Sequence, residues 1–123
     1  ENDYEDHGNA TVTDRATGLV WQQGGSEWID YAAAKEYVSG LNAERFAGHG
    51  DWRLPTVSEL MSLLEPEKGE NDLYIDPVFD SEQRWCWSSD QHSSGSAWPV
   101  YFDYGDVNWS SHGFDYFVRA VRP

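Results

Sequence analysis

The chain has 123 residues and carries 22 Asp and Glu against 8 Lys and Arg, which gives a formal net charge of −14. Binding to nucleic acid depends on a stripe of basic residues that displaces counterions, so this charge argues against nucleic acid and anionic membrane surfaces as partners. The length fits one domain with its own core, and the sequence has no run of about 18 or more apolar residues, which argues against membrane insertion.

The N-terminal region begins with an acidic stretch, and we expect residues 1–9 to be a disordered lead-in to a domain over residues 10–123. The chain opens on Glu1, without an initiator Met or a signal peptide, so we expect a mature form or, preferably, one domain of a longer protein. Two β-prone runs, at residues 11–13 and 19–21, flank a turn-rich stretch. This pattern predicts a β-hairpin.

A first helix is predicted over residues 27–40. Ser26 is a suitable cap, and Gly40 is a plausible end. Four apolar positions recur at every fourth residue and would form the buried stripe. They are Ile29, Ala33, Tyr37 and Leu41.

A second helix is predicted directly after Pro55. Thr56 and Glu59 have the spacing of a capping box, in which each side chain satisfies a backbone N–H of the other residue. The apolar positions Val57, Leu60, Met61 and Leu64 would face the core, and Pro66 would end the helix.

The rest of the chain reads as an exposed loop over residues 67–76 followed by strands. Trp98, Val100 and Phe102 alternate with polar residues, so we expect them to share a buried strand face. Tyr104-Gly105 indicates a hairpin turn, and a last strand is predicted over residues 116–121. Helices followed by mainly antiparallel strands predict the α+β class.

Several motifs, in this order, resemble the C-terminal domain family of the Legionella collagen-like protein. They are Thr11-Val12-Thr13-Asp14, Thr17-Gly18-Leu19-Val20-Trp21, Asp51-Trp52-Arg53-Leu54-Pro55-Thr56, Glu59-Leu60, Trp87-Ser88-Ser89, Ala97-Trp98, Phe102 and Val118-Arg119-Ala120-Val121-Arg122. The resemblance implies a C-type-lectin-like fold, with two helices beside twisted antiparallel sheets. It also implies a module of a bacterial, archaeal or phage surface protein, with a possible homo-oligomer. Some members act as adhesins for sulfated glycans, and others are variable proteins of diversity-generating retroelements.

The candidate ligand-binding residues lie between 90 and 116, where rings alternate with short polar side chains, as in other binding loops. They are Asp90, His92, Ser93, Ser94, Ser96, Tyr101, Asp103, Tyr104, Asp106, Asn108, Trp109, Ser110, Ser111, His112, Phe114, Asp115 and Tyr116. The alternative is an ordinary polar, β-rich tail. Exposed rings are the best anchors, although Trp109 is equally suited to packing.

We expect a non-enzymatic domain that binds a protein or glycan ligand on a cell surface, without cofactor or metal. The leading hypothesis is a retroelement variable protein. One alternative is a static, oligomeric, glycan-binding adhesin tip, and another is a domain that caps a fibre. Residues 85–118 contain no Lys or Arg, which argues against sulfated glycans as ligands of such an adhesin. The acidity suits either a soluble aromatic surface or a surface that serves cations or a basic partner.

The remaining chemistry-bearing residues are expected to be structural. Arg53, Arg119 and Arg122 would hold loops together by paired hydrogen bonds. Cys86, the single cysteine, would be a buried inert thiol. The acidic loop containing Glu70, Asn71, Asp72 and Asp76 lacks an EF-hand spacing and is expected to be solvated.

Overall fold

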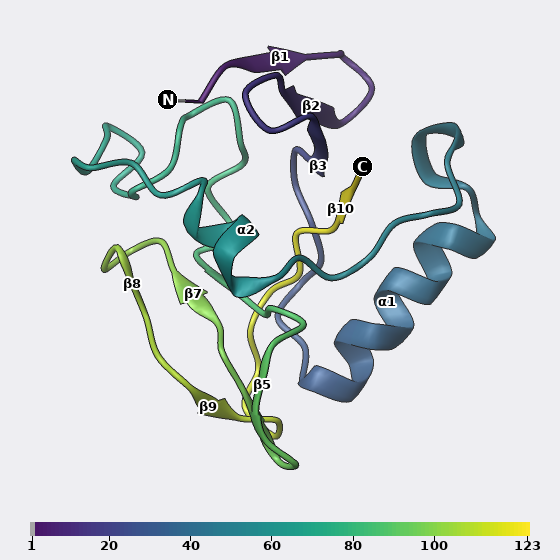
Figure 1. Ribbon diagram of the computed structural model, residues 1–123, viewed down its shortest axis with the longest axis vertical. Helices are drawn as coiled ribbons and strands as arrows, with labels where there is room; N and C mark the ends of the chain where they lie inside the picture. Colours follow the sequence, from purple (N-terminus) through teal and green to yellow (C-terminus); the bar gives the residue numbers. More distant parts are fainter. Residues whose placement is uncertain (1) are drawn as a thin grey trace.

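The computed structural model describes residues 2–123, and its helices and strands are those of the α+β class that the sequence predicts (Figure 1). The helices are α1 (Tyr31–Ala43), the short 3₁₀ helix η1 (Phe46–Gly48) and α2 (Val57–Met61). The strands are β1 (Tyr4–Asp6), β2 (Thr11–Asp14), β3 (Leu19–Gln22), β4 (Trp85–Cys86), β5 (Gln91–Ser93), β6 (Ser96–Ala97), β7 (Val100–Tyr101), β8 (Asp106–Val107), β9 (Ser110–Ser111) and β10 (Val121–Arg122).

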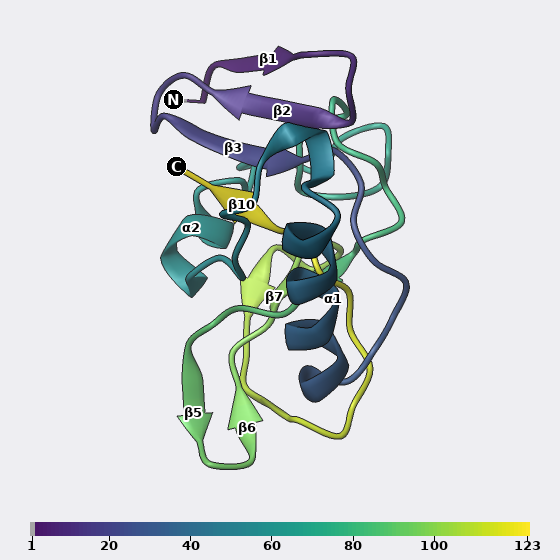
Figure 2. The same ribbon diagram turned by 90° about the vertical axis from the view of Figure 1, so that its right-hand side faces the viewer.

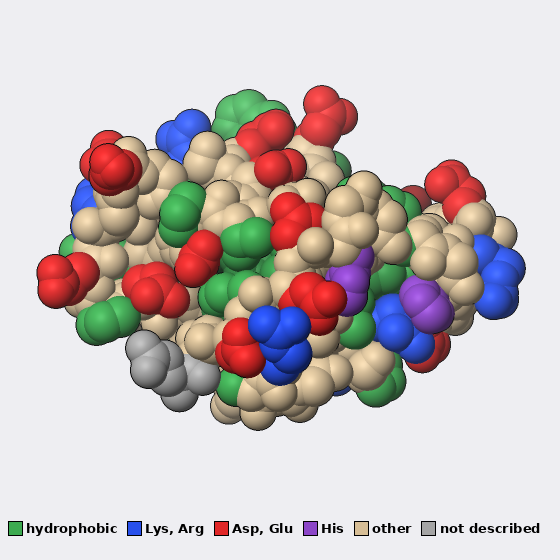
Figure 3. Space-filling view, turned by 90° about the horizontal axis from the view of Figure 1, so that it is seen from above, with side chains coloured by type: hydrophobic (Ala, Val, Ile, Leu, Met, Phe, Trp, Pro, Cys, Tyr) green, Lys and Arg blue, Asp and Glu red, His purple; other side chains and the backbone are tan. Residues whose placement is uncertain are grey.

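The strands form three antiparallel sheets, ordered β1-β2-β3-β10, β4-β7-β8 and β5-β6-β9. The first sheet contains the strands nearest to both chain ends, and the β5–β6 hairpin lies at the opposite end of the molecule (Figures 1 and 2). Viewed from the β1 end, acidic side chains are spread over the surface and do not gather in one patch (Figure 3).

Two hairpins agree with the sequence prediction, and one strand differs from it. β2 and β3 pair with Val12 opposite Trp21, and β7 pairs with β8 across the turn at Tyr104-Gly105. Gly105 has a φ of 75°, which glycine adopts without strain. The last strand, predicted over residues 116–121, is restricted to Val121–Arg122, because the backbone before it bridges other segments.

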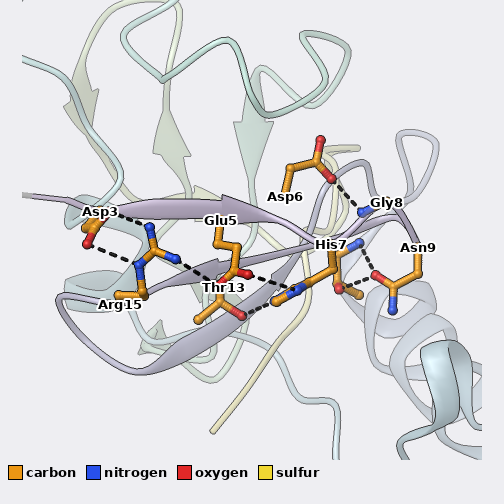
Figure 4. A network of polar contacts seen from close by, with 9 residues as sticks. Asp3, Glu5, Asp6, His7, Gly8, Asn9, Thr13 and Arg15 are labelled. Carbon is orange, nitrogen blue, oxygen red and sulfur yellow. Dashed lines mark hydrogen bonds and ion pairs between the residues drawn. The ribbon is translucent and has the colours of Figure 1, made fainter.

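The prediction of a disordered lead-in is wrong for Tyr4–Asp6, which form β1 and pair with β2. Glu1 lies outside the described residues. Arg15 donates to Asp3 and Glu5, and His7 Nε2 lies 2.6 Å from Thr13 Oγ1 (Figure 4). Backbone pairing with β2, with these side-chain contacts beside it, thus places in the sheet a stretch whose acidity alone predicted disorder.

Helix α1 begins later than predicted. Asp30, and not Ser26, caps it, because an Asp30 carboxylate oxygen accepts the Ala33 N–H at 2.9 Å. Ser26 Oγ instead accepts the Val118 N–H at 2.8 Å. Gly40 lies inside the helix, which continues to Ala43. The shift changes the buried stripe, which consists of Tyr31, Ala34, Val38 and Leu41.

Helix α2 confirms the capping box. Thr56 Oγ1 accepts the Glu59 N–H at 3.1 Å, and Glu59 Oε1 accepts the Thr56 N–H at 2.9 Å. The same carboxylate accepts two hydrogen bonds from Arg53, at 2.7 and 2.8 Å. The helix ends at Met61, before Pro66, and the Met61 side chain is 47% exposed where a core position was predicted.

The core consists of two clusters of buried apolar side chains. One lies among the four-stranded sheet, α2 and β7, and the other lies against α1 and contains Trp52 and Trp87. The main members of the first are Val12, Trp21, Leu60, Leu63, Phe79, Val100, Phe102 and Val121.

Candidate ligand-binding site

The segment over residues 90–116 folds into two hairpins, β5–β6 and β7–β8, followed by β9 and a loop (Figures 1 and 2). β6 is the middle strand of its sheet and pairs with both β5 and β9. Val100 and Phe102, at or just after β7, are fully buried. The backbone of the segment is therefore fixed by strand pairing and by the core.

Some of the predicted ligand-binding residues serve the fold. A carboxylate oxygen of Asp90 accepts the N–H of Val57, the first residue of α2. Ser96 is buried, and its hydroxyl lies 3.0 Å from His92 Nδ1 and 2.6 Å from Ser93 Oγ. These contacts make Asp90 and Ser96 supports for their neighbours rather than exposed contact residues.

A chain of hydroxyl groups fixes the end of the segment. Tyr116 Oη lies 2.9 Å from Tyr101 Oη and 2.9 Å from the Oγ of the buried Ser110. Desolvation, first, and the bonded Tyr116 hydroxyl, second, raise the pKa of Tyr101. Tyr101, Ser110 and Tyr116 thus form one linked group whose polar atoms satisfy one another.

Two more predicted residues are held by rings. Asp103 Oδ2 accepts the indole N–H of Trp85 at 2.8 Å. His112 stacks on Tyr31 with centroids 4.3 Å apart and planes 17° from parallel, which connects the loop to the start of α1. These residues position the site without being freely exposed.

The other candidates point to solvent and include three large rings. Tyr104 is 74% exposed, Phe114 is 62% exposed and Trp109 is 51% exposed. Trp109, which the sequence left as either a binding anchor or a packing residue, is thus displayed on the surface. The exposed smaller side chains are His92, Ser93, Ser94, Asp106, Asn108, Ser111 and Asp115.

The exposed rings belong to three groups. Trp109 stacks on His92, which also contacts the edge of Trp98 at 5.4 Å. Trp98 is half-buried, so its predicted place in the core with Val100 and Phe102 is wrong. Tyr104 borders a polar pocket of about 430 Å³, and Phe114 borders an apolar cleft of about 400 Å³.

Sequence reasoning missed the part of this surface that comes from outside residues 90–116. Trp28 is 63% exposed and lines the cleft with Phe114. The predicted helix over residues 27–40 included Trp28, and only recognition of Asp30 as the cap would have left it outside. Trp85, which also lines the cleft, lies on β4.

The arginines and the cysteine have the structural roles that the sequence predicts. Arg119 is fully buried and donates to the backbone carbonyls of Gln22, Gln23 and Asp80, and burial lowers the pKa of its guanidinium. Arg122 donates to both carboxylate oxygens of Asp51, at 2.6 and 3.1 Å. Burial raises the pKa of the Cys86 thiol to about 11.

Neither a metal centre nor a membrane span is found in the part of the chain that the structure describes. Over residues 2–123, His, Cys, Asp and Glu side chains do not gather in threes close enough to hold a metal ion. The Asn71 side chain bonds within its own loop, to Leu73 and Ile75. Helices in the same range are too short or too polar to cross a membrane.

Comparison with known proteins gives a family and no curated relative. None of the curated proteins matches the chain. The family described as "Lcl C-terminal domain" matches residues 10–122, which confirms the resemblance seen in the motifs. Membership of this family is consistent with a ligand-binding or adhesin-like domain. The chain therefore belongs to the Lcl C-terminal domain family.

Proposed function

We propose that the domain is a non-enzymatic recognition module, displayed on a cell or phage surface as part of a larger protein, that binds a protein or glycan ligand through residues 90–116. One observation carries this proposal. Tyr104, Trp109 and Phe114 are more than half exposed on a segment whose backbone is held by buried residues. Exposed rings on a fixed backbone give contact area at a low cost in conformational entropy.

The division between buried and exposed residues also supports a retroelement variable protein. The exposed positions are mainly Ser, Asp, Asn, His and aromatic residues, which adenine-directed mutation of Asn codons tends to produce. Exchange at His92, Ser94 or Asn108 would leave the buried core side chains in place, because these three side chains lie outside it. Such an arrangement would let the ligand surface vary while the fold stays constant.

The static, glycan-binding adhesin tip is the second candidate, and the pocket beside Tyr104 favours it. Lys68 and Arg84 line this pocket with Asp103 and Tyr104. Asp72 lines it too, so two acidic side chains balance the two basic ones. A neutral sugar would find both hydrogen-bond donors and acceptors here.

The genomic test separates the two candidates. A near-identical repeat beside a reverse transcriptase gene, differing at adenines under codons 90–116, would establish the variable protein. If sequencing of the locus shows neither the repeat nor the reverse transcriptase, the static adhesin is favoured.

The binding test uses the Tyr104→Ala/Trp109→Ala variant on arrays of glycans and cell-surface proteins. We expect every signal of the parent domain to fall at least tenfold while the melting temperature falls by only a few degrees. Met61→Ala is the matched control, because Met61 is an exposed apolar side chain outside the segment. Unchanged array signals from the double variant would contradict the proposed function.

A further inference from the structure

An apolar cleft of about 400 Å³ lies beside the exposed loop at residues 112–116. Its lining consists of four aromatic rings and one carboxylate, from Trp28, Trp85, Phe114, Asp115 and Tyr116. None of these five residues is a Lys or Arg. Aromatic residues on several sides and a single acidic group define the chemistry of the cleft.

Three backbone segments hold the cleft in shape. Ile29, next to Trp28, exchanges two backbone hydrogen bonds with Tyr116, at 2.7 and 3.0 Å. On the other side, the Phe117 N–H donates to the Trp85 carbonyl at 2.7 Å. The segment at Tyr116 and Phe117 is therefore paired on both sides, which fixes the backbone of the cleft between Ile29 and Trp85.

The rings form a corner rather than a flat platform. The Trp85 and Tyr116 planes are 83° apart, with centroids separated by 6.3 Å. Their polar atoms are engaged elsewhere, because the Trp85 N–H donates to Asp103 and the Tyr116 hydroxyl bonds Tyr101 and Ser110. A sugar needs several hydrogen-bonding partners besides a ring to stack on, and the engaged Trp85 and Tyr116 polar atoms leave few such partners in this cleft.

The charge of the cleft suits a cation. Aromatic faces are negative, so they attract a cation that lies within about 6 Å of a ring centroid. Asp115 is the acidic residue of the lining, and the formal net charge of the whole chain is −14. A quaternary ammonium ion needs no hydrogen-bond acceptor, so apolar ring faces satisfy it better than they satisfy a primary ammonium ion.

We propose that this cleft is an aromatic cage for the trimethylammonium group of choline. The choline cage rests on the proposed function, because Phe114, Asp115 and Tyr116 belong to the proposed ligand-binding segment. It specifies the class of ligand that this part of the segment would bind. A compact headgroup fits better than a methylated peptide. Peptides often dock by adding a strand to a free edge, and the segment at Tyr116–Phe117 already bridges Ile29 and Cys86.

The direct test titrates the intact domain with choline and with 3,3-dimethyl-1-butanol, its uncharged analogue of similar shape, by calorimetry and tryptophan fluorescence. We expect choline to bind about tenfold more tightly than the alcohol, because a charge difference worth about 1.4 kcal/mol corresponds to a factor of ten. Equal affinities would overturn the cage, since they indicate only an apolar hollow. Absence of choline binding up to about 100 mM would overturn it too.

Variants locate the binding. Trp28→Ala should weaken choline binding at least tenfold, and Asp115→Asn should weaken it about threefold. Both side chains are exposed, so their loss should leave the fold intact, and melting temperatures check this. Met61→Ala is the control, because Met61 is an exposed apolar side chain outside both the cleft and the ligand-binding segment and should leave choline affinity unchanged. Equal loss in Met61→Ala would contradict the assignment.

Two further experiments identify the molecule that carries the trimethylammonium group. Together with the array test, they distinguish failure of the choline cage from failure of the proposed function. Phosphatidylcholine vesicles that compete with free choline indicate a lipid headgroup, and vesicles that do not compete indicate a soluble or polymer-borne choline. Tighter binding of a trimethyl-lysine peptide than of choline would overturn the choline assignment. If choline fails to bind while Tyr104→Ala/Trp109→Ala still abolishes array binding, the choline cage is rejected and the proposed function is supported. If choline binds while the double variant keeps its array signals, only the proposed function is rejected.

Discussion

His92 and Trp109 stack face to face, with ring centroids 4.6 Å apart and planes 7° from parallel. His92 lies on β5 and Trp109 directly precedes β9, the two outer strands of the β5-β6-β9 sheet. The stack therefore spans the sheet across its middle strand. It restricts an exposed ring to one orientation, which lowers the entropy that ligand binding would cost.

The stack should contribute little to stability. Replacing Trp109 by Ala removes one half-exposed ring and one aromatic pair, and such pairs are worth about 0.5–1.5 kcal/mol. We expect urea denaturation to show a fall in the free energy of unfolding of about 1 kcal/mol. A loss of about 3 kcal/mol or more would mean that Trp109 belongs to the core.

Arg119 should be far more important for stability than Arg122. Arg119→Met removes the donor to the carbonyls of Gln22, Gln23 and Asp80. The Gln23 carbonyl keeps the Asp80 N–H, and each carbonyl left unsatisfied costs about 1–3 kcal/mol. We expect a loss of about 3 kcal/mol or more by chemical denaturation. Arg122→Met, which removes a pair with the exposed Asp51, is the control and should change stability much less. Similar losses for both variants would contradict the difference in burial.

Cys86 should be unreactive in the folded protein. Its pKa of about 11 and complete burial leave almost no accessible thiolate at pH 8, so labelling by a disulfide reagent should follow unfolding. Rapid labelling without denaturant would show that the thiol is accessible.

The same raised pKa predicts a pH effect. The unfolded thiol loses its proton near pH 8.5 and the folded thiol near pH 11, so the folded state binds more protons between these values and stability falls as pH rises through them. We expect the free energy of unfolding to fall more steeply with pH in the parent domain than in Cys86→Ala over this window. Equal pH dependence in the two proteins would contradict the raised pKa of Cys86. Tyrosine ionisation affects both proteins equally and therefore cancels in the comparison.

Strand β1 should behave as part of the fold. Removing residues 1–7 deletes the edge-on contact between Tyr4 and Phe79, at 5.1 Å, and the donors to the buried Asp14. We expect a loss of about 2 kcal/mol or more, since burial of a single large ring is worth about that much. A truncated domain as stable as the parent would support the disordered lead-in that the sequence predicts.

Local patterns were predicted best. The capping box at Thr56 and Glu59 and the hairpin of β2 and β3 depend on residues close in sequence, and both are confirmed. The start of α1 was missed because Ser26 and Asp30 are both good caps, and the choice depends on Val118, which is distant in the chain. The pairing of β1 with β2 and the contact of Arg15 with Asp3 could not be predicted from the amino-acid composition of the first residues either.

The candidate surface was predicted in outline only. Composition identified the segment over residues 90–116, yet alternation alone could not separate Ser93, which is exposed, from Ser96, which is buried. That distinction depends on the pairing of β6 with two strands. Trp28 was missed because the other residues that line its cleft are 57 or more residues away in sequence.

The sheet that contains β1 and β10 lies at one end of the molecule, and the β5–β6 hairpin lies at the other. This polarity has a practical consequence for measurement. A domain immobilised on a sensor through Pro123 would present the hairpin, with the stacked His92 and Trp109, to the solution, whereas attachment at the hairpin turn, near Gly95, would turn this stack toward the support. The orientation on the chip would then decide whether a ligand is detected at all.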